Sequence, residues 1–62
     1  MHSLFVSEPE LKWCASLIND VGADQEIRLS DSQARTVLMG TTNMSAERIT
    51  VAVNVLRRQG RI

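Results

Sequence analysis

The chain has 62 residues, 44% of them hydrophobic, and seven basic side chains balance seven acidic ones, so its formal net charge is zero. A chain of this length forms one domain, and one cysteine with one histidine supplies neither an internal disulfide nor a zinc-binding set. There is no long apolar run for a membrane-spanning helix and no basic region typical of a signal peptide, so we expect a cytoplasmic protein without metal or cofactor.

The first predicted helix covers residues 7–22. Ser7 and Glu10 have the spacing of a capping box, and Pro9 falls where its missing N–H group costs nothing. Apolar residues at helical spacing predict the buried face, and Gly22 is the expected helix end. The buried face should consist of Leu11, Cys14, Ala15, Ile18 and Val21.

Residues 26–29 (EIRL) alternate between charged and apolar side chains. This alternation predicts one short β-strand with Ile27 and Leu29 on the same side. A lone strand needs a partner, which would be residues 60–62 or the equivalent strand of a second subunit. Because the chain is short for a stable isolated domain, we expect a homodimer.

A second helix is predicted for residues 30–40, with Ser30 and Gln33 as its capping box. Ala34, Val37 and Leu38 should face inward. Residues 40–43 (GTTN) are poor helix formers and good turn formers, so a long turn is expected before the next helix.

The third predicted helix covers residues 45–59 and has the clearest amphipathic pattern of the chain. Ser45 is its expected N-cap, and Gly60 suits the left-handed position that follows many helices. The outward face carries side chains that can read base edges or bind phosphates. The inward residues are Ile49, Ala52, Val53 and Leu56, and the outward ones are Glu47, Thr50, Asn54, Arg57 and Arg58.

Charge is unevenly distributed along the chain. Residues 1–31 contain six acidic and two basic side chains, whereas residues 32–62 contain five arginines and one acidic residue. The two halves therefore carry net charges of −4 and +4, an asymmetry that suggests contact with nucleic acid. The alternative is that the acidic half neutralises the basic half within a dimer.

The predicted fold is a compact, mainly α, three-helix domain with one short strand, and it resembles the winged-helix variety of helix-turn-helix DNA-binding domains. The residues that carry the resemblance are Ser45, Ile49, Ala52, Val53, Leu56, Gly60 and Ile62. It implies a sequence-specific transcription regulator whose third helix lies in the major groove of double-stranded DNA. The long turn, Thr42 and the acidic Glu47 depart from the family pattern. The implied DNA-contacting residues are Arg35, Glu47, Arg48, Thr50, Asn54, Arg57, Arg58 and Arg61.

A second resemblance is to ribbon-helix-helix repressors, in which a strand from each of two subunits enters the major groove. It rests on IRLSDS, followed by a helix and then by ERITVAVNVLRRQG. It implies that Glu26 and Arg28 point toward DNA while Ile27 and Leu29 point inward. The predicted second helix is shorter than this family requires, so the winged-helix resemblance ranks first.

Protein binding is the main alternative to DNA binding. An enzyme is not expected, because the sequence has no nucleophile with a nearby base, no phosphate-binding loop and no metal set. Trp13 and Leu17 lie one turn apart beside the predicted buried face of the first helix, and Val51 and Val55 do so on the third. Together they would form an apolar patch that serves as a dimer interface or as the contact surface of a small adaptor or inhibitor.

Overall fold

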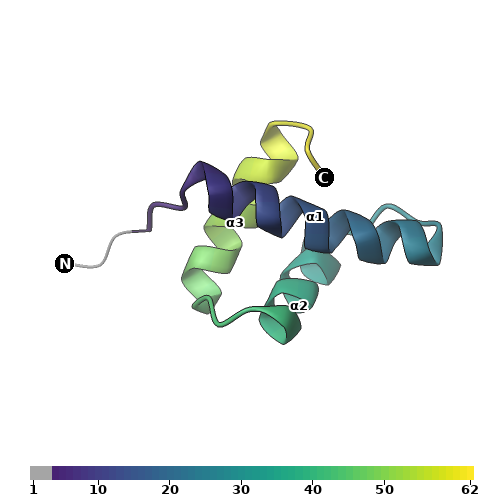
Figure 1. Cartoon of the computed structure of the whole chain (residues 1–62), viewed down its shortest axis with the longest axis horizontal. Coiled ribbons are helices and arrows are strands. Elements are labelled where there is room, and N and C mark those ends of the chain that lie inside the picture. Colours follow the sequence, from purple (N-terminus) through teal and green to yellow (C-terminus); the bar gives the residue numbers. More distant parts are fainter. Residues whose placement is uncertain (1–3) are drawn as a thin grey trace.

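Three α-helices make up the fold of residues 4–62, the part of the chain that this computed structural model describes (Figure 1). They are α1 (Glu8–Gln25), α2 (Asp31–Thr41) and α3 (Ala46–Arg58). In the view of Figure 1, α1 lies along the long axis and α3 crosses behind its first half. Each helix contacts the other two, so one core serves all three. No helix within residues 4–62 is long and apolar enough to cross a membrane.

The core is formed where the apolar faces of the three helices meet. The predicted inward faces are buried, except that Val21 and Val37 are half-buried at the edge of the core. Three buried residues outside the helices, Val6, Leu29 and Ile62, complete the core. The chain segments before α1, between α1 and α2, and after α3 are therefore each held by one buried apolar side chain.

The β-strand predicted for residues 26–29 is wrong, since the described residues form no strand. The helix α1 continues past Gly22 to Gln25, and Glu26 ends it in a left-handed conformation with φ of 56°. The backbone N–H groups of Glu26 and Ile27 donate to the carbonyl oxygens of Ala23 and Gly22 at 3.2 and 2.9 Å. These N–H groups cap a helix instead of pairing with a neighbouring strand.

Gly22 does not end α1, contrary to the prediction from the sequence. It is buried inside α1, where the chain turns back over the helix. A β-carbon at position 22 would lie 2.8 Å from the carbonyl oxygen of Ile27. Glycine therefore allows the connection between α1 and α2 to lie directly against α1.

The predicted caps at the helix N-termini are confirmed. Ser7 with Glu10 and Ser30 with Gln33 form complete capping boxes. At α3 the Ser45 side chain accepts from the backbone N–H of the third helical residue at 3.2 Å, without a reciprocal partner. Local sequence thus determines where each helix begins.

The helix α2 continues one residue past its predicted end at residue 40. Gly40 and Thr41 are helical, which leaves residues 42–45 between the two helices. The Thr42 hydroxyl donates to the carbonyl oxygen of Leu38 at 2.7 Å and thereby caps the end of α2. Thr42 is one of the residues that depart from the winged-helix pattern. At the other end of α3, Gly60 adopts the predicted left-handed conformation with φ of 72°.

Candidate nucleic-acid interface

The outward side of α3 is a polar surface, which we call the α3 outer face and define as Glu47, Thr50, Asn54 and Arg58. All four side chains are exposed, while the opposite side of the helix is buried in the core. The Thr50 hydroxyl donates to the carbonyl oxygen of Ala46 at 3.0 Å, so its single O–H group is already in use. The exposed Asn54 amide offers both a donor and an acceptor to an outside partner.

Arg48, predicted to face DNA, is bound within the protein. Its Nη2 donates to Oε2 of Glu10 at 2.7 Å and to the carbonyl oxygen of Phe5 at 3.3 Å. These contacts join the start of α3 to the start of α1 and to the segment that precedes it. Arg48 therefore lies on the flank of α3 that faces α1 and not on the α3 outer face.

Two further arginines that were predicted to bind phosphates also have partners within the chain. Arg57 donates through Nε to Oδ1 of Asp31 at 2.8 Å and through Nη2 to the carbonyl oxygen of Leu29 at 2.6 Å. Arg61 makes a two-point contact with the Glu8 carboxylate, at 3.1 Å from Nη1 and 2.7 Å from Nη2. Both arginines join the C-terminal end of the chain to earlier elements.

These three ion pairs neutralise part of the charge asymmetry within a single chain. In each pair the acidic residue comes from residues 1–31 and the arginine from residues 32–62. The alternative considered from the sequence placed this neutralisation between two subunits. Within the described residues, it takes place between segments of the same molecule.

Two of the ion pairs lower the pKa of their glutamate, Glu8 in one and Glu10 in the other. The hydrogen bond from Arg61 holds the pKa of Glu8 below its ordinary value of 4.5. For Glu10, the hydrogen bond from Arg48 is the largest cause of a lowered pKa, and the backbone and hydroxyl of Ser7 add to it. Both carboxylates are thus stabilised in the charged form that binds arginine.

Arg35 and Arg58 are the two arginines of residues 4–62 without a hydrogen bond or ion pair. Arg58 belongs to the α3 outer face, and Arg35 is half-buried on α2. Arg35 follows Asp31 by one helical turn, and Asp31 binds Arg57 of α3. This spacing places Arg35 on the same side of α2 as Asp31.

The predicted apolar patch is only partly exposed. Trp13 is 51% exposed, but Leu17, Val51 and Val55 are half-buried against the core. The most exposed large apolar side chain of residues 4–62 is Phe5, at 72%, which was not predicted as a site residue. The sequence signal for Phe5 was its place in the apolar run of residues 4–6, directly before the first capping box. Only Val6 of this run is buried, so Phe5 remains exposed.

Cys14 is fully buried beside Met44, with 3.7 Å between its Sγ and the methionine Sδ. Burial raises the pKa of the Cys14 thiol. The thiol is therefore protonated and shielded at neutral pH, as in a cysteine that packs as a small apolar side chain.

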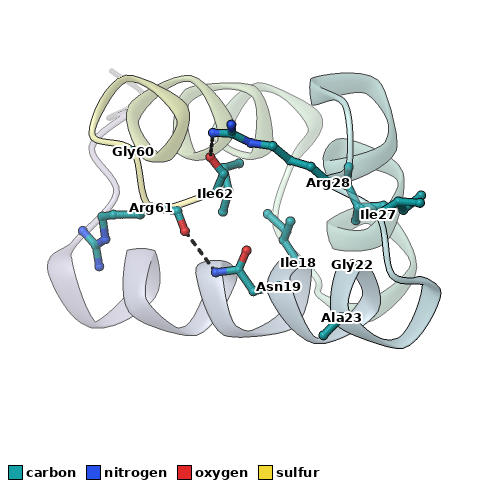
Figure 2. Close-up of a pocket in the computed structure, with 10 residues that line it drawn as sticks. Ile18, Asn19, Gly22, Ala23, Ile27, Arg28, Gly60, Arg61 and Ile62 are labelled. Carbon is teal, nitrogen blue, oxygen red and sulfur yellow. Dashed lines mark hydrogen bonds between the residues drawn. The ribbon is translucent and has the colours of Figure 1, made fainter.

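A groove of about 420 Å³ lies between α1, residues 27–29 and the C-terminal residues 60–62 (Figure 2). Figure 2 shows two side chains that reach the C-terminal segment from opposite sides. The Asn19 amide donates to the carbonyl oxygen of Arg61 at 3.0 Å, and Arg28 Nη2 donates to that of Ile62 at 2.9 Å. Arg28, which the ribbon-helix-helix resemblance directed toward DNA, thus holds the C-terminal segment in place.

No protein-family model, curated protein or solved structure matches this chain.

Proposed function

We propose that this chain is a sequence-specific DNA-binding regulator of transcription that acts as a homodimer in the cytoplasm and places α3 in the major groove. The observation that carries the proposal is the α3 outer face, whose four polar side chains are all exposed and whose Arg58 has no hydrogen bond or ion pair within residues 4–62. A guanidinium without an internal partner can bind a phosphate without breaking an ion pair that supports the fold.

The order of the elements supports the same proposal. A helix-turn-helix unit has two helices joined by about three to four residues, and residues 42–45 give the α2–α3 connection this length. In such a unit the second helix carries the base-reading side chains. Here the second helix is α3, whose residues Ile49, Ala52, Val53 and Leu56 are buried in the core while the α3 outer face is exposed.

The roles of the predicted DNA-contacting residues divide accordingly. Asn54 is the main candidate for base reading, because an asparagine amide can form two hydrogen bonds with adenine in the major groove. Arg35 and Arg58 are assigned to phosphates, and Glu47 and Thr50 adjoin the bases. Arg48, Arg57 and Arg61 are assigned to the fold through their ion pairs.

Binding of a mixed-sequence DNA duplex at low salt, followed by a salt titration, tests the proposal. Non-specific binding requires no knowledge of the operator, and the slope of affinity against salt reports the number of phosphates contacted. We expect binding that weakens steeply as salt increases. Absence of binding up to about 100 micromolar protein at low salt would overturn the proposal.

Variants at three exposed positions, Arg58, Glu47 and Asp24, distinguish binding of DNA at the α3 outer face from a general effect of net charge on binding. Arg58→Ala should weaken binding to all sequences and lower the salt slope by about 1. Glu47→Gln and Asp24→Asn both raise the net charge by one, but only Glu47 lies on the α3 outer face. Glu47→Gln should therefore strengthen binding while Asp24→Asn leaves it nearly unchanged, and equal effects would contradict the assigned face.

A small protein-binding adaptor or inhibitor is the second candidate function. The observation that favours it is the exposure of large apolar side chains, 51% for Trp13 and 72% for Phe5. Tryptophan and phenylalanine are enriched at protein interfaces. Under this alternative, the chain would not bind DNA in the salt titration.

A further inference from the structure

Three members of the α3 outer face form a single row along the helix, because Thr50, Asn54 and Arg58 follow one another at intervals of four residues. The Thr50 hydroxyl donates to the carbonyl oxygen of Ala46 at 3.0 Å, so it lies against the helix backbone. The γ-methyl group is therefore the part of this exposed side chain that is left for an outside partner. The Asn54 amide has no hydrogen bond within residues 4–62. The row thus presents a methyl group, an amide and a guanidinium in succession.

The α3 outer face has no positive charge before the last turn of the helix. Arg48 is the arginine near the start of α3, but its Nη2 is bound to Oε2 of Glu10 at 2.7 Å, on the flank that faces α1. The three members of the outer face that precede the last turn are Glu47, Thr50 and Asn54. The commonest specific contact with guanine is a two-point hydrogen bond from arginine or lysine to O6 and N7. Because this part of the face lacks such a donor, it favours A·T over G·C base pairs.

We propose that the α3 outer face selects A·T base pairs, with the Thr50 methyl group against the 5-methyl group of thymine and the Asn54 amide on adenine. Thymine is the base whose methyl group lies in the major groove, and the threonine methyl is one of the apolar groups that contact it. Four residues rise about 6 Å along a helix and base pairs are about 3.4 Å apart, so the two bases lie within about two base pairs of each other. This inference rests on the proposed function and names the bases that α3 selects.

The acidic Glu47 is compatible with the same choice of bases. It precedes Thr50 by three residues, is exposed, and has no ion pair within residues 4–62. An ionised carboxylate only accepts hydrogen bonds, and the donors that base edges present in the major groove are the amino groups of adenine and cytosine. Glu47 can therefore accept from an adenine of an A·T pair, whereas on guanine it meets only acceptor atoms.

Binding of the full chain to three labelled duplexes of equal length, measured by fluorescence anisotropy at low salt, tests the proposal. The first duplex has alternating A·T pairs, the second has alternating G·C pairs, and the third has deoxyuridine in place of every thymidine of the first. Deoxyuridine lacks only the 5-methyl group, and the alternating sequence offers adenine and thymine in every register, so no operator needs to be known. We expect the A·T duplex to bind more tightly than the G·C duplex. It should also bind about threefold or more tightly than the deoxyuridine duplex, since a buried methyl contact is lost there.

Variants at Thr50 separate its methyl group from its hydroxyl. Thr50→Ser keeps the donor to Ala46 and removes the methyl group, so it should bind the A·T and deoxyuridine duplexes equally. Thr50→Val keeps a methyl group and removes the hydroxyl, so it should retain the preference for thymine. Thr36→Ser is the matched control, because Thr36 is exposed on α2 and its hydroxyl likewise donates to the carbonyl oxygen four residues earlier, at 3.0 Å. This control should leave the preference unchanged, and Asn54→Ala should reduce the preference for A·T over G·C.

The results that would overturn this inference differ from those that would overturn DNA binding. Absence of binding to all three duplexes up to about 100 micromolar protein would remove the proposed function and this inference with it. Binding that does not favour the A·T duplex over both others, or a preference for thymine that Thr50→Ser retains, would remove the base selection and leave DNA binding in place. Circular dichroism of each variant checks that the helices are retained, so that a lost preference is not the result of unfolding.

Discussion

Arg57 at the end of α3 and Asp31 at the start of α2 form an ion pair, with Nε of the arginine 2.8 Å from Oδ1 of the aspartate. The same guanidinium also donates to the backbone carbonyl oxygen of Leu29, at 2.6 Å. These contacts join the start of α2 to the end of α3, while residues 42–45 join the two helices at their other ends. An arginine at the edge of the proposed DNA-binding surface thus supports the position of α3.

Arg57→Ala should lower the free energy of unfolding by about 1 to 2 kcal/mol, because Asp31 and the Leu29 carbonyl both lose their donor. The neighbouring Arg58→Ala is a matched control, since Arg58 is exposed and has no partner within residues 4–62. It should leave stability within about 0.5 kcal/mol of the wild type. Urea denaturation measures both, and equal losses would contradict a specific role for Arg57.

Gly22→Ala should destabilise the fold by about 1 to 3 kcal/mol, because the added β-carbon would lie 2.8 Å from the backbone oxygen of Ile27. Gly40→Ala provides the comparison within another helix. No atom outside the helix backbone lies within 4 Å of a β-carbon built at Gly40. Gly40→Ala should therefore stabilise the protein by about 0.5 to 1 kcal/mol through helix propensity. Thermal unfolding followed by circular dichroism compares the two variants, which should change the melting temperature in opposite directions.

Glu26→Gly should stabilise the protein by up to about 1 kcal/mol. Glu26 adopts a φ of 56°, a conformation that is costly for residues with a β-carbon but not for glycine. The reverse substitution is available at the end of α3, where Gly60 has a φ of 72°. Gly60→Ala should cost about 1 kcal/mol. A loss of stability in Glu26→Gly, measured by chemical denaturation, would show that the glutamate side chain outweighs the backbone cost.

Acid should weaken the fold because the pKa values of Glu8 and Glu10 are lowered by their arginine partners. A group whose pKa is lower in the folded than in the unfolded state contributes stability above the unfolded value, and this contribution is lost as the pH falls through the folded value. The free energy of unfolding should therefore decrease as the pH falls below about 4.5, the ordinary value for these groups.

Two variants separate the Glu10–Arg48 pair from other acidic groups. Glu10→Gln removes the titrating carboxyl group, and Arg48→Gln removes the main cause of its lowered pKa. Urea denaturation at a series of pH values should show a weaker dependence of stability on pH in both variants. If both retain the wild-type pH dependence, the Glu10–Arg48 pair does not contribute to acid sensitivity.

The helix starts could be predicted from sequence because their determinants lie within a few residues. Ser7, Ser30 and Ser45 each accept a hydrogen bond from the backbone N–H three residues later, and this geometry follows from local spacing alone. The buried face of α3 was equally predictable from the 3.6-residue period. The error at residues 26–29 arose because two alternating apolar residues were interpreted as a strand, although Ile27 is exposed and only Leu29 is buried.

The candidate site was harder to predict than the helices, because sequence does not show which charged side chains meet. Arg48, Arg57 and Arg58 have similar local surroundings in the sequence, yet only Arg58 lacks a partner within residues 4–62. An ion pair between residues some 26 or 38 positions apart depends on how the helices are packed. No local pattern distinguishes an arginine that supports the fold from one that is available to a phosphate.

By itself, the sequence determined the three helices, their N-terminal caps and the side of each that is buried, because caps and amphipathic periods act over one or two helical turns. The tertiary structure decided the conformation of residues 26–29, the need for glycine at position 22 and the pairing of three arginines with acidic residues. These features depend on distances between segments far apart in the chain, which arise only when the apolar faces pack into one core.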